Sequence, residues 1–445
     1  MKVYLQSLGC KLNQSELESL ACQFVQAGHT VVDTVREADL CVLNTCAVTQ
    51  TAVSKSRQAI RRLRRANSDA CLAVTGCYAQ MWPQEIRELG SVDLIVGNEY
   101  KEHLVERAEK ELGIKGPGSE RAWVPSPDSR FPIPQARTRA FVKIQDGCDN
   151  HCTYCIVRVA RGRQRSRPRR DVLAEVEARV AVGYQEVVLT GVHIGAYGRD
   201  SGRQGDESLW ALVEAILMRT NVRRLRLSSI EPWDLAPACL RLWEDSRLCR
   251  HLHLPLQSGC DATLQRMGRG YTAGQFAALV EAAREAIPGV AITTDVIVGF
   301  PGESEAEFNE SLRFVKAMGF ARTHVFKYSA RSGTPAATMP GQVSPLVKKA
   351  RSRAIMEVSR HSAEAFRRAF LGCTLEVLWE AQTKGSELGQ KTFWSGLTDN
   401  YLRVRTQEGK NLSNTITRTK LVALVGDGMW GKVCEEGRCV FSVGL

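Results

Sequence analysis

Short apolar segments alternate with amphipathic helical segments along most of this 445-residue chain, and this alternation constrains its fold more than any other feature. In residues 1–112 the expected strands are KVYLQSLG, ADLCVLNT, CLAVTG and VDLIVGN, and helical stretches such as SELESLACQFVQAG lie between them. Strands connected by helices pair in parallel, because each helix carries the chain back across one face of the sheet. We therefore predict an open parallel α/β domain over residues 1–112.

The alternation resumes at residue 138, after a segment rich in proline and glycine at 113–137 that has the composition of a linker. Over residues 138–368 the expected strands are AFVKIQ, EVVLTG, LRLSS, HLHLPLQ, ITTDVIVG and HVFKYS. These six strand–helix units are fewer than the eight of a closed α/β barrel. We predict an open, partial (β/α)6 barrel over this range, and an α/β fold class for the chain.

Residues 369–445 differ from the rest, because turns rather than helices separate the expected strands. These strands are TLEVLWEAQ, TFWSGLT, YLRVRTQ and TKLVALVGDG. Short strands in this arrangement are typical of a small antiparallel β-barrel of the OB-like kind, a class that often binds oligonucleotides.

Composition and charge narrow the cellular setting. No apolar run approaches 18 residues and the chain starts without a signal-peptide pattern, so we expect a cytoplasmic protein with no membrane segment. The cytosol keeps thiols reduced, and the 15 cysteines are therefore poor candidates for a disulfide framework. A net charge of +12 favours a polyanionic partner such as nucleic acid.

Three cysteines are closely spaced in the segment DGCDNHCTYC, at Cys148, Cys152 and Cys155. They follow the first expected barrel strand, at the rim where α/β barrels place their chemistry. Three thiolates can hold three irons of a four-iron cluster, and the open fourth iron can bind the amino and carboxylate groups of S-adenosylmethionine. We predict that these cysteines are catalytic cluster ligands and that Tyr154 lies beside the cofactor. A zinc site completed by His151 or by a distant residue is the alternative.

This spacing resembles that of the radical S-adenosylmethionine superfamily, and later strand ends support the resemblance. GYQEVVLTGVHIG puts Glu186 and Gly191 where the second strand of such barrels lines the amino group of the cofactor. LSSIEP, LPLQSG and TTDVIVGFPGE make Ser229, Gln257 and Asp295 further candidates for cofactor contacts. Taken singly, residues of these types at strand ends are often turn or capping residues.

A second set of cysteines follows three expected strands of the N-terminal sheet, at Cys10, Cys46 and Cys77. Ligands gather beyond the carboxyl ends of the strands in open parallel sheets. We therefore expect these three thiols to converge in space and to form a second cluster site with one open iron. Three unrelated core cysteines are the alternative.

In combination, SLGCKLNQSE, NTCAVT, TGCYAQ and QDGCDNHCTYC resemble the methylthiotransferase family over nearly the whole chain. The resemblance implies an N-terminal methylthiotransferase domain, a radical S-adenosylmethionine barrel and a C-terminal TRAM domain at 369–445. It also implies two 4Fe–4S clusters, an auxiliary one on the three N-terminal cysteines and a radical one on the three barrel cysteines. One departure is that relatives usually read close to IIPYARG after the cluster, whereas Arg158 and Val159 replace proline and tyrosine here.

The chemistry that the resemblance implies is insertion of sulfur and a methyl group at an unactivated carbon. Such a C–H bond is not acidic enough for a general base, so a hydrogen atom must be removed by a radical. The adenosyl radical would do this, a sulfur species at the auxiliary site would add to the carbon, and a separate S-adenosylmethionine would provide the methyl group. A low-potential electron donor is then a necessary partner.

Two basic runs lie next to the predicted cluster sites. SKSRQAIRRLRR has six lysines and arginines, and RVARGRQRSRPRR has seven arginines and no acid. We predict RNA binding by Arg61, Arg62, Arg163, Arg165 and Arg167, because cations neutralise backbone phosphates. A solvated face is the alternative explanation of such runs.

Lys11 and Leu12 bear on the substrate within the resemblance. Lys–Leu/Val–Asn–Gln after the first cysteine is common in the branch that methylthiolates N6-threonylcarbamoyladenosine at position 37 of tRNA, beside the anticodon. The isopentenyladenosine branch more often reads Gln–Met–Asn. We therefore expect a monomeric enzyme that binds the anticodon stem-loop and produces the 2-methylthio derivative of threonylcarbamoyladenosine. A methylthiotransferase acting on isopentenyladenosine tRNA or on a ribosomal protein side chain, and a non-catalytic iron–sulfur RNA-binding sensor, are the alternatives.

Overall fold

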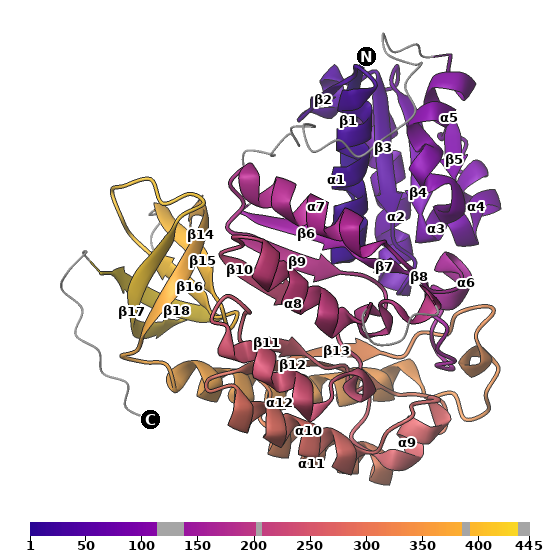
Figure 1. Ribbon diagram of the computed structural model, residues 1–445. Coiled ribbons are helices and arrows are strands. Elements are labelled where there is room, and N and C mark those ends of the chain that lie inside the picture. Colours follow the sequence, from indigo (N-terminus) through magenta and orange to yellow (C-terminus); the bar gives the residue numbers. More distant parts are fainter. Residues whose placement is uncertain (114–137, 202–206, 385–391, 435–445) are drawn as a thin grey trace.

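The computed structural model describes residues 1–113, 138–201, 207–384 and 392–434 (Figure 1). The expected linker at 113–137 therefore lies almost entirely outside the described residues, as do parts of the C-terminal region. Three bodies of secondary structure follow one another along the chain, coloured indigo, magenta to orange, and yellow in Figure 1. No helix within the described ranges has both the length and the apolar character that a bilayer crossing requires.

The N-terminal body is a five-stranded parallel sheet with the strand order β2-β1-β3-β4-β5, which confirms the predicted open α/β domain. Its strands are β1 (Lys2–Ser7), β2 (Thr30–Val32), β3 (Leu40–Thr45), β4 (Cys71–Gly76) and β5 (Leu94–Val96). Its helices are α1 (Lys11–Gln26), α2 (Gln50–Ala66), α3 (Cys77–Met81), α4 (Pro83–Arg87) and α5 (Leu104–Glu111), with short η1 (Val35–Glu37) and η2 (Asn98–His103). The sequence did not reveal β2, because its three residues are too few to show a periodic pattern.

Alternation along β3 explains why helices cover both faces of this sheet. Leu40 and Val42 pack with the apolar side of α1 and α5, whereas Cys41 and Leu43 pack with that of α2. Successive side chains of a strand point to opposite faces, so a strand that is apolar throughout needs a cover on each side. The helices leave only the strand ends open, and the carboxyl ends of β1, β3 and β4 lie side by side there.

The central body contains six parallel strands in the order β6-β9-β10 and β11-β12-β13, as predicted for a partial barrel. These are β6 (Arg139–Lys143), β9 (Glu186–Thr190), β10 (Arg224–Leu227), β11 (His251–His253), β12 (Ala291–Val298) and β13 (Arg322–Lys327). Bridges between Leu225 and Leu248 and between Ser229 and His253 join the two halves. A small two-stranded antiparallel sheet, made of β7 (Gln145–Asp146) and β8 (Arg165–Ser166), follows β6.

Helices cover the outside of this barrel, and polar side chains line its inside. The helices are α6 (Val157–Arg161), α7 (Arg169–Ala181), α8 (Leu209–Arg219), α9 (Asp261–Arg266), α10 (Ala273–Ala286), α11 (Glu305–Met318) and α12 (Pro345–Arg368). Short η3 (Ile194–Ala196), η4 (Arg199–Ser201), η5 (Pro232–Asp234), η6 (Pro237–Glu244) and η7 (Pro335–Ala337) complete the loops. Val187 and Leu225 belong to the apolar core under the helices, whereas Glu186 and Arg226 at the alternate positions are paired with each other on the other face.

The C-terminal body is a closed five-stranded barrel with the order β14-β15-β16-β18-β17. Its strands are β14 (Thr374–Lys384), β15 (Thr392–Thr398), β16 (Arg403–Thr406), β17 (Ile416–Val425) and β18 (Gly428–Val433). The predicted small barrel is confirmed, but its expected antiparallel character is wrong for one pair, because β16 and β18 run parallel. The sequence did not reveal β18, whose segment GMWGKV contains two glycines and follows β17 almost directly.

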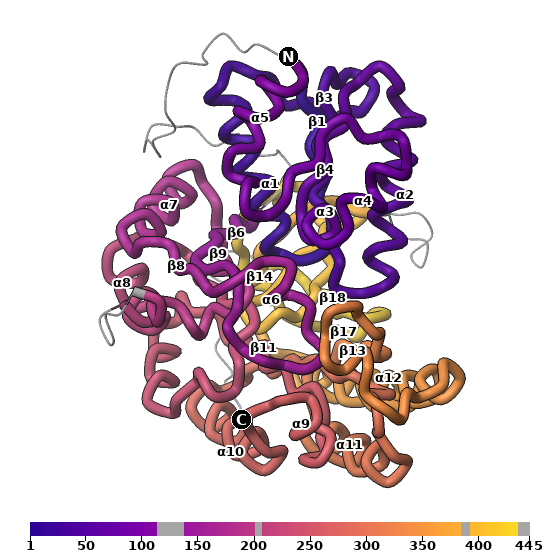
Figure 2. The backbone as a smooth tube through the Cα atoms, turned by 90° about the vertical axis from the view of Figure 1, so that its right-hand side faces the viewer, coloured from indigo at the N-terminus to yellow at the C-terminus, as the bar shows by residue number. Residues whose placement is uncertain are grey.

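The turn after β15 joins the C-terminal body to the central one. The carboxylate of Asp399 accepts hydrogen bonds from Arg250 at 2.6 and 3.1 Å, and the amide of Asn400 donates to the Gly289 carbonyl at 3.1 Å. Arg226 donates to the carbonyls of Thr398 and Asp399 at 3.3 and 2.8 Å. This turn thus closes the amino-terminal end of the barrel. At the other side α1 lies beside β6, with the N-terminal sheet above the barrel (Figures 1 and 2).

Candidate active site

The loop between β7 and α6 brings Cys148, Cys152 and Cys155 together as half-buried free thiols. The backbone amide of Cys155 donates to the Cys152 carbonyl at 3.1 Å, and that of Asn150 donates to the Cys148 sulfur at 3.4 Å. Gly147 has a φ of +68°, and a Cβ there would lie 1.9 Å from the Arg163 carbonyl oxygen, so the loop needs glycine at its start. The closely spaced motif therefore gives one compact set of thiols.

Side chains that the sequence did not point to surround these thiols. Arg269 pairs with Glu231 and places one nitrogen 3.6 Å from the Cys152 sulfur. His193 lies with Nδ1 3.9 Å from the Cys148 sulfur and Nε2 2.5 Å from Asp234. Burial alone would lower the pKa of His193, but hydrogen bonds to Asp234 and Cys148 raise it to about 9. Both groups are cationic near neutral pH and favour an anionic occupant.

Burial raises the pKa of the Cys155 thiol to about 12 and also raises that of Cys152, which the Arg269 charge partly offsets. The thiols of Cys152 and Cys155 are therefore protonated at neutral pH without a metal, and binding of a metal there would release their protons. The ring of Tyr154 lies edge-on to that of Phe300, with 6.4 Å between the ring centroids. The structure places Tyr154 beside the cysteines, in an apolar part of the barrel rim.

The second set of cysteines lies at the carboxyl ends of β1, β3 and β4. Cys10 precedes α1, Cys46 follows β3, and Cys77 begins α3 directly after β4. A Cβ added to Gly9 would lie 2.8 Å from the Cys46 sulfur, and the thiols of Cys10 and Cys77 each influence the pKa of Cys46. The topology of the sheet therefore brings these cysteines together, although they are far apart in sequence. Burial raises the pKa of Cys46 to about 11.

Arg331 provides a test of whether an anionic group fits between these cysteines. It lies in the loop after β13, it is 4% exposed, and its charge interacts with the Cys46 thiol. One guanidinium nitrogen donates to Gln50 at 3.1 Å, but Nε and the other terminal nitrogen are buried without a partner in the described part of the chain. Buried donors without acceptors are costly, and an iron–sulfur cluster would supply acceptors. The residues present therefore fit such a cluster.

A buried ion network lies beside the second set of cysteines, where α1 meets the barrel. Glu16 accepts from Arg161 at 2.7 Å and from Lys101 at 2.6 Å, and Asp146 accepts from Arg161 at 3.0 Å and from Lys143 at 2.8 Å. Three cations therefore face two carboxylates. Although burial raises the pKa of Glu16, the charges of Lys101, Arg161 and Lys143 hold it well below its ordinary value. The excess positive charge again favours an anion at the cysteines.

Besides Tyr154, five cofactor contacts were predicted, and four of these five lie in the carboxyl-terminal half or beyond the end of a barrel strand. Gly191 follows β9, and a Cβ there would lie 2.9 Å from the Gln145 carbonyl oxygen. Gln257 has a φ of +67°, and its backbone amide donates a hydrogen bond to the backbone carbonyl of Asp295 at 2.8 Å. Ser229 forms the bridge to His253 that joins the halves of the barrel.

Glu186 is placed differently, and a cofactor contact there conflicts with its surroundings. It is the first residue of β9, at the end of the barrel opposite to the cysteines, and it is fully buried. Both of its carboxylate oxygens accept from Arg226, at 2.7 and 3.0 Å. The strand was identified correctly, but the sequence did not show that Arg226 on the next strand occupies this carboxylate.

The interior of the barrel also receives side chains from the other two bodies. Lys11 extends from the start of α1 with its ammonium 5.8 Å from the ring centre of Tyr401, which comes from the turn after β15. Tyr401 stacks on His251 with ring centres 4.6 Å apart and accepts a hydrogen bond from Arg139 at 3.0 Å. Burial lowers the pKa of Lys11. Higher in the barrel, Asp295 pairs with His253 at 3.3 Å, close to His324.

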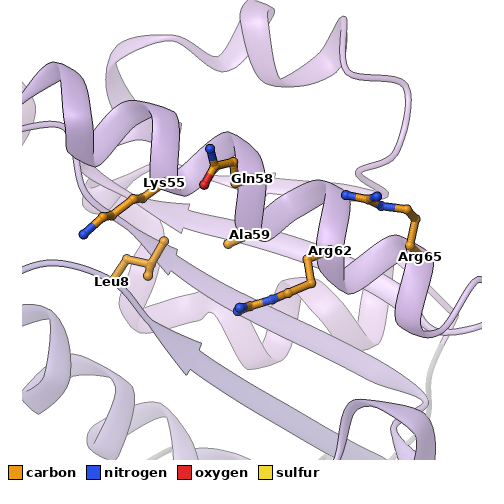
Figure 3. Close-up of a pocket in the computed structure, with 6 residues that line it drawn as sticks. All are labelled: Leu8, Lys55, Gln58, Ala59, Arg62 and Arg65. Atoms are coloured by element: carbon orange, nitrogen blue, oxygen red, sulfur yellow. The ribbon is translucent and has the colours of Figure 1, made fainter.

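The predicted RNA-binding arginines fall into two groups. Arg61 and Arg62 are exposed on α2, where Arg62 lines a hollow of about 450 Å³ (Figure 3). The hollow is also lined by Leu8, Lys55, Gln58, Ala59 and Arg65. Arg163 and Arg165 are exposed after the barrel cysteines. Arg167 differs, because it is half-buried and one terminal nitrogen of its guanidinium donates both to Glu175 at 2.6 Å and to the Lys143 carbonyl at 2.7 Å.

Comparison with known proteins adds a family context to these sites. Residues 2–97 match the family described as "Uncharacterized protein family UPF0004", and residues 142–315 match the radical SAM superfamily. Threonylcarbamoyladenosine tRNA methylthiotransferase MtaB of Bacillus subtilis is 38% identical over 98% of this chain and 97% of that protein. The protein of the same name from Thermotoga maritima is 38% identical over 85% of this chain and 86% of that protein. The tRNA-2-methylthio-N(6)-dimethylallyladenosine synthase of Clostridium tetani is 34% identical over 95% of each.

Among solved structures, the radical S-adenosylmethionine methyltransferase TsrM from Kitasatospora setae is similar in fold. Its complex with tryptophan and a cofactor analogue gives a TM-score of 0.57 at 18% identity, over 76% of this chain and 75% of that chain. At this identity the similarity concerns the arrangement of the elements alone. The superfamily match covers the cysteine loop, the end of β6 and strands β9 to β12, and it ends before β13.

Proposed function

Because the chain belongs to the family of radical S-adenosylmethionine tRNA methylthiotransferases, we propose that it converts N6-threonylcarbamoyladenosine at position 37 of tRNA to its 2-methylthio derivative. Relatives named for threonylcarbamoyladenosine and relatives named for dimethylallyladenosine are similarly close, at 38% and 34% identity in the examples above. Overall identity therefore does not separate the two substrates. The position of one side chain, Lys11, carries the choice.

The barrel cysteines would hold the radical cluster. When bound there, a 4Fe–4S cluster supplies electrons that cleave S-adenosylmethionine to an adenosyl radical. Arg269 and His193 place positive charge beside the sulfurs of Cys152 and Cys148 and would stabilise the negative charge of the bound cluster. Gly191, Ser229, Gln257 and Asp295 are the proposed cofactor contacts; Gly191, Ser229 and Gln257 follow the ends of strands, and Asp295 lies within β12.

The second site, at Cys10, Cys46 and Cys77, would hold the auxiliary cluster, and a sulfur species at that cluster would provide the inserted sulfur. Arg161, Arg331 and Lys101 are buried cations whose charges interact with these thiols. A loop after β13 bridges the two sites, because the Ala336 amide donates to the Thr153 carbonyl at 2.9 Å. An external low-potential electron donor remains part of the proposal.

Lys11 supports threonylcarbamoyladenosine because its ammonium has no carboxylate partner in the described residues. Glu186, the acid whose charge influences the pKa of Lys11, is already paired with Arg226. A threonylcarbamoyl group carries a carboxylate, whereas an isopentenyl group is apolar. The Lys11 ammonium can pair with the carboxylate of a threonylcarbamoyl group, whereas an isopentenyl group would leave this buried charge without a partner.

The position of Lys11 also suits a substrate that must reach both cysteine sites. Lys11 follows Cys10 directly, and its ammonium lies over a ring of the barrel interior. An adenine whose C2 approaches the second site would therefore bring its N6 substituent into the reach of the Lys11 side chain. We propose that Tyr401 and His251 form the floor against which this substituent packs.

RNA contacts are proposed at the exposed cations near the two sites. Arg61, Arg62 and the basic hollow on α2 flank the second site, since Leu8 in its lining precedes Cys10 by two residues (Figure 3). Arg163 and Arg165 follow the barrel cysteines on the β7–β8 side. Phosphates of the anticodon stem-loop would bind to these cations. Arg167 is not part of this proposal, because its guanidinium forms an ion pair with Glu175.

The test supplies the reconstituted enzyme with three tRNAs, carrying threonylcarbamoyladenosine, isopentenyladenosine or neither. We expect 2-methylthio product from the first alone, measured by mass spectrometry of nucleosides. Lys11→Gln should lower kcat/KM for this tRNA by about tenfold, the usual cost of one charge-assisted hydrogen bond. Lys110→Gln is the matched control, because Lys110 is exposed on α5, away from the barrel.

Other outcomes would change the proposed function. Product from the isopentenyladenosine tRNA alone would assign the other tRNA substrate. Methylthiolation of a ribosomal protein with no product on any tRNA would assign that class. Failure to cleave S-adenosylmethionine under a strong reductant would favour an RNA-binding sensor. Each result overturns the choice of threonylcarbamoyladenosine.

A further inference from the structure

Arg331 is an exception among the buried arginines of this protein. The six others each form an ion pair with a carboxylate in the described ranges: Arg161, Arg179, Arg224, Arg226, Arg269 and Arg351. Arg331 is 4% exposed and has no carboxylate within ion-pair distance there. Its Nε and one terminal nitrogen are buried without a hydrogen-bond partner among the described residues, and burial of an uncompensated charge is strongly unfavourable.

The fold holds this guanidinium in place. Both the amide and the hydroxyl of Thr334 donate to the Arg331 carbonyl, at 3.0 and 2.8 Å. The third guanidinium nitrogen donates to Gln50 at 3.1 Å, across the boundary between the barrel loop and the start of α2. Two neighbouring donors of Arg331 thus remain oriented together while the rest of the residue is fixed.

The surroundings of Arg331 indicate what the missing acceptor is. Its loop also contacts the barrel cysteine loop, through the bond from the Ala336 amide to the Thr153 carbonyl at 2.9 Å. The acidic group whose charge acts on the Arg331 guanidinium is the thiol of Cys46. Cys46 lies four residues before Gln50 in the sequence. Arg331 therefore lies between the two cysteine sites, next to sulfur and not to carboxylate.

We propose that Arg331 binds an anionic sulfur ligand, of the hydrosulfide or persulfide class, at the open position of the auxiliary site. This inference rests on the second cluster of the proposed function. A guanidinium presents parallel donors to an anion, and its two unpaired nitrogens match a ligand that carries negative charge on sulfur. Gln50 and Thr334 act as positioning residues, because they touch Arg331 and fix its direction.

The experiment uses the full chain with Cys148, Cys152 and Cys155 changed to alanine, so that only the N-terminal site can hold iron. In this background Arg331 is compared with Arg331→Gln and Arg331→Lys. We measure iron content, the midpoint potential by electron paramagnetic resonance, and the apparent Kd for added hydrosulfide from the change of the same signal. Arg57→Gln is the control, because Arg57 lies on α2 and pairs with Glu85 at the surface.

Arg331→Gln should retain iron, shift the potential to more negative values, and weaken hydrosulfide binding by about tenfold or more. The potential falls because reduction adds negative charge that the guanidinium no longer stabilises. Arg331→Lys keeps the charge and should preserve most of the potential, but it loses the two parallel donors and should still bind hydrosulfide more weakly. If Arg331→Gln loses its iron, the proposal is tested on Arg331→Lys instead. Normal hydrosulfide binding by Arg331→Lys would then refute the proposal.

Failure of this inference differs from failure of the proposed function. An unchanged potential and hydrosulfide affinity in Arg331→Gln, with iron retained, would overturn the role of Arg331 alone. Weaker tRNA binding with unchanged hydrosulfide affinity would instead assign Arg331 to a phosphate. Absence of iron from the background protein itself would overturn the second cluster and, with it, the sulfur ligand.

Discussion

At the barrel rim the three thiols come from one loop, whereas in the N-terminal body they come from the ends of three neighbouring strands. The loop site depends on local backbone geometry, such as the positive φ of Gly147. The strand-end site depends on the order β1-β3-β4 and on the packing of α1 against the barrel. The two sites hold the same number of cysteines, but a disturbance of domain packing should affect them unequally.

The largest effect is expected from removing each set of cysteines. Anaerobically reconstituted protein should contain about eight irons, as two four-iron clusters. Changing Cys148, Cys152 and Cys155 to alanine should leave about half of the iron, and a further change of the three N-terminal cysteines should leave none. Iron analysis together with absorption spectra measures this directly.

Other buried thiols provide the control for this prediction. Cys22 in α1 and Cys41 in β3 are buried, and burial raises their pKa values to about 12 and about 11. Both belong to the packed body of the N-terminal domain and not to its strand ends. Their replacement by alanine should leave the iron content unchanged. Iron retained after all six changes would contradict both sites.

A smaller effect is expected from the ion network that supports only the strand-end site. Glu16→Gln leaves Arg161 and Lys101 without their shared carboxylate, and breaking such a buried pair costs about 3 to 5 kcal/mol. The N-terminal site should then lose iron on mild heating while the barrel site keeps it. The spectroscopic signal of the cluster at the barrel site serves as the internal reference. Equal loss of iron from both sites would show that the network does not support the strand-end site specifically.

The same network has a pH dependence of known sign. The charges around Glu16 hold its pKa well below the ordinary value of about 4.5, despite its burial. Its stabilising effect is therefore complete above about pH 4.5 and is lost as the pH falls through the lower pKa of the folded state. The free energy of unfolding should rise with pH across this acidic window in the native protein, and the slope should be smaller in Glu16→Gln.

The contrast between the sites also explains what could be predicted from the sequence. The strand–helix alternation predicted the parallel sheet and the six-stranded barrel, because alternation is a local signal. The convergence of Cys10, Cys46 and Cys77 needed one further step, from strand ends to sheet topology. Short or irregular elements carried too little pattern, so β2, β18 and the parallel pairing of β16 were missed.

Partners that are distant in sequence account for the remaining differences. Arg161 and Arg167 belong to a basic run, yet Arg161 is buried in an ion pair with Glu16, and half-buried Arg167 is paired with Glu175. Glu186 lies on the expected strand, but Arg226 occupies its carboxylate. The composition of a segment does not show which of its charges meet a counter-charge after folding. Arg331 is the converse case, since only the structure shows that two of its nitrogens have no hydrogen-bond partner among the described residues.

The smallest effect is expected from the arginines beside the loop site, where exposed arginines should bind RNA and an arginine in an ion pair should not. Arg163→Ala with Arg165→Ala should weaken tRNA binding and reduce the slope of log K against log salt by roughly one to two units, because each phosphate contact contributes somewhat less than one unit. Arg167→Ala should leave that slope unchanged and lower stability instead, since it breaks the bonds to Glu175 and the Lys143 carbonyl. Filter binding over a range of salt concentrations and thermal unfolding give the two readouts. Equal slopes for all three proteins would show that the run is a solvated face, and RNA would then have to reach the barrel from the α2 side, past Arg61 and Arg62.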